Sequence, residues 1–118
     1  ASVGERKITA DRIEEGLEHL YAEHRFLDAA FMRPIPHEAY YYNAGYFYLF
    51  GHSYAARAIE LLPKDVQESF HARLRPHLLK VQRNDGSPSD FLLSSYCVVA
   101  GTSYLALALE LGLPEHDL

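Results

Sequence analysis

Residues 51–61 read GHSYAARAIEL, and fifty positions further on residues 101–111 read GTSYLALALEL. Seven of the eleven positions are identical without a gap, and Tyr46 and Tyr96 continue the same register. Chance similarity between two alanine-rich helices gives fewer matches than this. We therefore interpret the chain as two copies of one unit, since a period of about 20–50 residues is typical of stacked supersecondary units.

The pattern around the repeat predicts four main helices. Apolar residues at helical spacing predict amphipathic helices over 9–25 and 63–83. The stretches 39–62 and 94–111 carry very few charges, which predicts helices that are buried on most sides. No stretch alternates apolar and polar residues, so we expect no sheet. The predicted fold class is all-α, with two helical hairpins in which outer amphipathic and inner buried helices alternate.

Length and composition limit the domain organisation and the partners. The 118 residues suffice for a single domain over 1–118, with repeat units at about 9–62 and 63–113. A net charge of −5 argues against a non-specific nucleic-acid binder, which needs a surplus of Lys and Arg. The single cysteine, Cys97, excludes an intrachain disulfide and leaves the compartment open.

The first residues and one uncharged stretch bear on targeting and on the membrane. The start at Ala1 has no basic-then-apolar leader, so we expect no signal peptide here. Residues 91–109 contain no charged side chain, but they include several Ser, Thr and Tyr residues and lack a basic flank. This pattern favours a helix buried within protein over a membrane span, and the localisation stays open.

Residues 78–88, LLKVQRNDGSP, resemble the QW repeat of squalene and oxidosqualene cyclases and the related prenyltransferases. Leu78, Gln82 and Gly86 match that repeat, while Pro88 stands where the family has Trp. In the family, this Gln and Trp tie the end of an outer helix to the next inner helix. The resemblance therefore implies a structural role for Gln82 and Gly86.

Residues 90–97, DFLLSSYC, look like the segment DFYHTCYC of protein prenyltransferase β subunits. Asp90 is then expected to cap the helix that follows it. Leu93 occupies the place of the family's zinc-binding His, so the zinc site is not carried over. The acidic Asp-x-Asp-Asp cluster of hopene-forming cyclases has no counterpart in this chain.

The resemblance covers residues 40–113 and implies an α/α toroid of five to seven hairpins with ligands at the inner helices. Two hairpins do not close such a ring. The chain is therefore a piece of a longer toroid, or copies of it assemble, or it is a small four-helix bundle that shares the repeat.

The histidines predict neither a metal site nor a cofactor. His19 and His24 are five residues apart, and His71 and His77 are six apart. Neither spacing places two imidazoles on one helix face, as zinc sites on helices require. We also find no nucleophile with an adjacent base, so no catalytic residue is predicted.

Aromatic residues supply the candidate binding surface. At helical spacing Tyr42, Tyr46 and Phe50 share a face, and Tyr96 is the repeat equivalent of Tyr46. His52 is a further candidate lining residue, because the equivalent position of the second copy is Thr102. If this face lines a cavity, it would bind an apolar or isoprenoid ligand or hold a cation over its rings. The alternative is that the rings fill the core.

Three functions follow from these observations. The first is a non-catalytic helical repeat module that associates with other hairpins, as a homo-oligomer or within a longer chain. The second is a fragment of an isoprenoid-handling enzyme that contributes an aromatic pocket wall. Such an enzyme would be inactive as this fragment and, when complete, of the terpenoid cyclase or prenyltransferase class. The third is a helical-bundle dimerisation domain.

Overall fold

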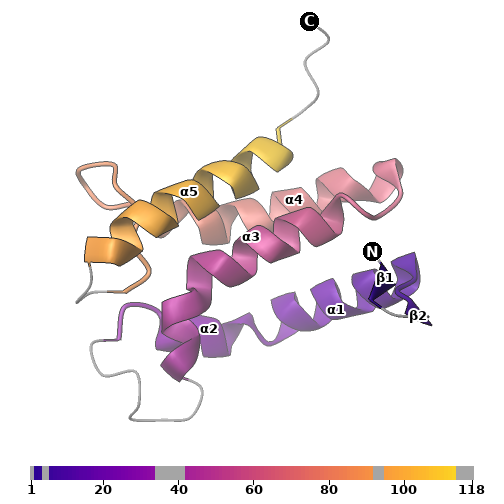
Figure 1. Ribbon diagram of the computed structural model, residues 1–118, viewed down its shortest axis with the longest axis horizontal. Helices are drawn as coiled ribbons and strands as arrows, with labels where there is room; N and C mark the ends of the chain where they lie inside the picture. The colour runs from indigo at the N-terminus through magenta and orange to yellow at the C-terminus, as the bar shows by residue number, and fades with distance from the viewer. Residues whose placement is uncertain (1, 4–5, 34–41, 92–94, 114–118) are drawn as a thin grey trace, which may run out of the picture.

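The computed structural model describes residues 2–3, 6–33, 42–91 and 95–113 (Figure 1). Helices make up most of this part of the chain, which confirms the predicted all-α class. They are α1 (Ala10–Ala22), α2 (His24–Ala30), the 3-10 helix η1 (Tyr42–Phe47), α3 (Tyr48–Ile59), α4 (Lys64–Leu79) and α5 (Ser95–Leu111). The expectation of no sheet is wrong for the N-terminus, where β1 (Ser2–Val3) pairs antiparallel with β2 (Arg6–Lys7).

The first predicted helix, 9–25, is two helices. Thr9 caps α1 by accepting a hydrogen bond from the N–H of Arg12 at 3.4 Å. The helix ends at Glu23, whose backbone angles of φ −103° and ψ 13° leave the helical region. The chain resumes as α2, in which His24 and Ala30 are buried.

α3 is the central helix. In Figure 1 it runs between α5 and α1, and it also packs against α4. Its start differs from the predicted helix over 39–62, because residues 42–47 form a 3-10 helix before the α-helix begins. Seven of its twelve residues are buried, as predicted for a helix with few charges: Tyr48, Leu49, His52, Ser53, Ala55, Ala56 and Ile59.

α5 is buried along one face, formed by Gly101, Leu105 and Ala108. The expectation that it is buried on most sides is therefore wrong for this chain. Tyr96 is 76% exposed and Val99 is 70% exposed. α5 packs against α3 and α4, and no other element in the described part of the chain covers its far side.

The contact between α3 and α5 depends on a glycine. A Cβ at Gly101 would lie 2.8 Å from Cδ1 of Leu49, which is fully buried. This is closer than carbon atoms pack, so the two helices approach here because position 101 has no side chain. α4 closes the core with Phe70, Leu74 and Leu78.

Within the described ranges, none of the helices combines the length and the apolar character that crossing a membrane requires.

Candidate functional site

A pocket of about 230 Å³ opens between η1, α3 and α5, and we call it the aromatic pocket. Its lining residues are Phe47, Phe50, Asp90, Tyr96, Cys97, Ala100, Gly101 and Tyr104. The ring of Phe50 meets the edge of Tyr104 at a centroid distance of 5.5 Å, and Phe47 lies 6.2 Å from Phe50. These edge-to-face contacts form a continuous aromatic wall.

The aromatic pocket unites two of the five predicted lining residues, Phe50 and Tyr96. Tyr42 and Tyr46 lie in η1, and their side chains are outside the described part of the structure. The predicted shared face assumed a continuous α-helix, whereas residues 42–47 form a 3-10 helix. His52 does not line this pocket; it is buried elsewhere in the core.

The predicted structural residues lie in and beside one turn. Gln82 forms an isolated bridge with Pro88, and its side-chain amide donates to the carbonyl of Gly86 at 3.2 Å. Gly86 has φ +85°, a conformation that favours glycine. The QW-like segment therefore closes its own loop at the end of α4.

Asp90 caps the start of α3, which the sequence did not predict. Its carboxylate accepts a hydrogen bond from the N–H of Leu49, in the first turn of α3, at 2.9 Å. Its carbonyl accepts from the N–H of Met32, which follows α2. Residues 92–94, between Asp90 and α5, lie outside the described ranges. Burial raises the pKa of the Asp90 carboxyl, against the opposing hydrogen bond from Leu49.

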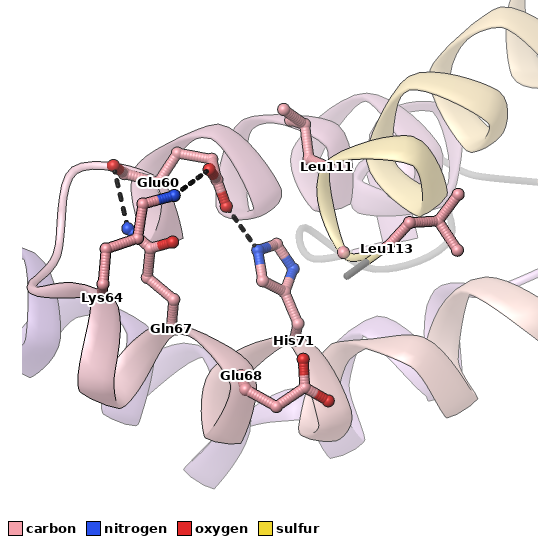
Figure 2. A pocket seen from close by; sticks show the side chains of 8 residues that line it. Glu60, Lys64, Gln67, Glu68, His71, Leu111 and Leu113 are labelled. Atoms are coloured by element: carbon pink, nitrogen blue, oxygen red, sulfur yellow. Dashed lines mark hydrogen bonds and ion pairs between the residues drawn. The ribbon is translucent and has the colours of Figure 1, made fainter. Parts of the chain in front are cut away.

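A second pocket, of about 250 Å³, lies where the ends of α3 and α5 meet α4 (Figure 2). Glu60 joins two of its neighbours, since its carboxylate lies 2.7 Å from Nε2 of His71 and 3.9 Å from Nζ of Lys64. The amide of Gln67 donates to the carbonyls of Glu60 and Leu62 at 3.2 and 2.8 Å. These bonds fasten the turn between α3 and α4, so we assign this pocket a structural role.

Three helices bring four ionisable side chains together, and we call them the histidine cluster: His24 and Asp28 from α2, His52 from α3 and His77 from α4. Nε2 of His24 lies 2.8 Å from Nε2 of His52. The ring of His24 stacks on His77 at a centroid distance of 3.5 Å. Nδ1 of His24 lies 3.2 Å from Oδ2 of Asp28 without hydrogen-bond geometry.

Tyr48 and Lys80 complete the surroundings of the cluster. Nδ1 of His52 donates to the carbonyl of Tyr48 at 2.6 Å, and the two rings stack. The Tyr48 hydroxyl is buried without a partner among the described residues, and burial, with the charge of Asp28, raises its pKa. Lys80 forms an ion pair with Asp28.

Burial and neighbouring charges together shift the pKa values of the cluster. Burial lowers the pKa of His52 to about 4, against a backbone hydrogen bond, and the charges of His24, His77 and Lys80 lower it further. Burial also lowers the pKa of His77, with His24 adding to the effect. For Asp28, burial acts to raise the pKa, but Lys80 and His24 outweigh it and hold that pKa below its usual range.

The sequence analysis missed the histidine cluster because it looked for histidine pairs on one helix. The members lie up to 53 positions apart and meet through the packing of α2, α3 and α4. One readable signal was the spacing of His24 and Asp28, which are four residues apart and therefore share a helix face.

Comparison of the chain with protein-family models, with curated proteins and with solved structures found no match. The likeness to cyclases and prenyltransferases therefore rests on the repeat and on the motifs of residues 78–97.

Proposed function

We propose that the chain is a non-catalytic helical repeat module whose inner helices, α3 and α5, continue into a further hairpin of the same kind. The occupant of its open face is another copy of the repeat unit, from a second chain or from a longer one. The proposal rests on the different surroundings of the two repeat glycines, Gly51 and Gly101.

A glycine of α5 packs on a leucine of α3 where the two repeat units meet. The equivalent positions on the outer side of each unit have no such partner among the described residues. Gly101 of α5 packs on Leu49 of α3, and Leu49 has no exposed surface. The repeat offset makes Val99 the equivalent of Leu49 and Gly51 the equivalent of Gly101. Val99 is 70% exposed, and a Cβ at Gly51 would meet no atom within 4 Å. A further unit would place its own glycine on Val99.

The surface chemistry of α5 supports the same proposal. Residues 95–109 carry no charge, and the exposed side of the helix presents Tyr96, Val99 and Leu107 to solvent. Exposed large apolar side chains gathered on one helix are typical of contact sites. Covering it would yield roughly 25 cal/mol for each Å² of apolar area removed from water.

Light scattering on a sizing column over a hundredfold dilution tests this proposal, together with binding of the apolar dye ANS. We expect the wild type to associate as its concentration rises. Val99→Glu should abolish this association and should bind less dye than the wild type. Ala72→Glu, at an exposed position of α4, is the matched control and should leave both unchanged. A wild-type monomer with dye binding equal to that of Val99→Glu would contradict the proposal. A two-fold dimer that survives Val99→Glu would favour a dimerisation domain instead.

The aromatic pocket supports a second candidate, a wall of an isoprenoid-binding site. Its volume of about 230 Å³ is below the roughly 300–1,000 Å³ of complete ligand pockets, so further residues would have to complete it. Calorimetric titration with farnesol tests this candidate. Tyr96→Ala should weaken saturable binding while the fold persists, since Tyr96 is 76% exposed. Equal binding by both proteins would exclude a lining role for Tyr96.

A further inference from the structure

The histidine cluster holds three potential metal ligands from two helices at one point. The ligand atoms of His24, Asp28 and His77 all lie within 4.8 Å of one another. The side chain of His24 is 5% exposed, whereas that of Asp28 is 43% exposed. The group therefore runs from the core to the surface, which gives an ion a path of entry.

The hydrogen bonds of the cluster fix which nitrogen of His24 is free. A carbonyl oxygen only accepts, so Nδ1 of His52 must carry the hydrogen that it shares with Tyr48. His52 is 1% exposed, and burial favours its neutral form, so its Nε2 is an acceptor. His24 must then donate from Nε2, and a neutral His24 has a bare lone pair at Nδ1.

A second acceptor lies close to this nitrogen. Nδ1 of His24 is buried without a hydrogen-bond partner among the described residues, and a carboxylate oxygen of Asp28 lies 3.2 Å away. Two acceptors at this distance repel unless a proton or a metal ion lies between them. In metal sites, a ligating histidine donates its other N–H to a fixed acceptor, which is the relation of His24 to His52.

We propose that His24, Asp28 and His77 bind a divalent transition-metal ion of the zinc class, with His52 as the positioning residue of His24. Two imidazoles and one carboxylate suit such an ion, and three protein ligands leave a position open. The inference does not depend on the proposed repeat function. Ligands at roughly 2.0–2.2 Å from one ion require His77 to tilt out of its stack on His24.

Lys80 gives the proposal a distinctive consequence. Its ammonium group pairs with the Asp28 carboxylate that the ion would need, so lysine and metal compete for the same oxygen atoms. Removing this ammonium group should therefore strengthen metal binding. A role of the cluster in folding alone would not predict that result.

The test is a calorimetric titration of the untagged chain with Zn²⁺, with Co²⁺ absorption spectra as a second readout of ligand geometry. We expect one ion per chain with an affinity that falls at least about tenfold in His77→Gln and in Asp28→Asn. Lys80→Gln should bind at least about threefold more tightly. His19→Gln, which removes an exposed histidine of α1, is the matched control and should bind like the wild type.

His52 is tested by a pair of variants. His52→Gln keeps an acceptor for His24 and should retain most of the affinity, whereas His52→Leu should lose about tenfold. Circular dichroism establishes that each variant is folded. If the wild type shows no saturable binding at micromolar Zn²⁺, or if Asp28→Asn and Lys80→Gln both bind like the wild type, the proposal is overturned.

Discussion

The carboxylate of Asp90 accepts a hydrogen bond from the backbone N–H of Leu49 at 2.9 Å, across 41 positions of the chain. This bond fixes the start of α3 to the segment that leads into α5. Because both groups are buried, neither finds a substitute in water when the other is removed.

Replacing the Asp90 side chain should therefore destabilise the fold. Asp90→Ala removes the cap of α3 and leaves a buried N–H unpaired, so we expect a loss of about 1–2 kcal/mol in unfolding free energy. Asp90→Asn keeps an acceptor oxygen without a buried charge and should cost less than half as much. Urea unfolding followed by circular dichroism measures both, and equal losses would show that the hydrogen bond is unimportant.

The stability of the fold should fall in weak acid. The pKa of His52 in the folded state is about 4, below the ordinary value of 6.5, so the unfolded chain takes up a proton first as the pH falls. Stability that is complete above pH 6.5 is therefore lost towards pH 4, by roughly 3 kcal/mol. Urea unfolding in the presence of EDTA measures this loss. His52→Gln removes the titrating group and should lose much less, and an identical pH profile for that variant would assign the effect to other groups.

The two glycines of the repeat should respond differently to alanine. Gly51 lies in α3 with open space around it, so Gly51→Ala should stabilise the chain by about 0.5–1 kcal/mol through helix propensity. At Gly101 the new methyl group would press on the buried Leu49 side chain, and this crowding offsets the gain. We expect Gly101→Ala to be the less stable variant by at least about 1 kcal/mol. Thermal unfolding at low protein concentration compares them, and equal stabilisation would mean that Leu49 moves aside freely.

The hydrogen bond between Glu60 and His71 should contribute to stability, whereas the exposed side chain of Glu68 should contribute little. The side chain of His71 is 5% exposed, so Glu60→Ala leaves a buried imidazole nitrogen without its partner. We expect a loss of about 1–2 kcal/mol. Glu68→Ala should change the unfolding free energy by less than about 0.5 kcal/mol, because the Glu68 side chain is 70% exposed. Similar midpoints of urea unfolding for the two variants would contradict this ranking.

The spacing of apolar and charged residues and the positions of glycine and proline predicted much of the fold. The scarcity of charge before Arg57 correctly indicated that α3 is the buried helix, and Gly112 correctly marked the end of α5 at Leu111. The break at Glu23 was not predictable, since no glycine or proline marks it and the tertiary packing of α2 determines it. The exposed side of α5 was missed because a charge-free helix looks buried whether or not its covering partner is present.

The candidate site was predicted less well than the fold. Phe50 and Tyr96 do line one pocket, but His52 belongs to a cluster whose members come from three helices. Helical spacing reports neighbours along one helix, and it carries no information about which faces of different helices meet. Asp90 illustrates the same limit, because its partner Leu49 is remote in sequence.

The glycine contact between α3 and α5 is asymmetric, because one helix contributes the glycine and the other contributes the leucine. Gly101 belongs to the later helix and Leu49 to the earlier one, so the surfaces left open at the two sides are unlike: one offers Gly51 and the other offers Val99. A contact between unlike surfaces is heterologous, and a two-fold axis does not generate it. Chains joined in this way would follow one another head to tail. Such a series keeps one Gly51 face and one Val99 face at its ends unless the rotation per step closes it into a ring.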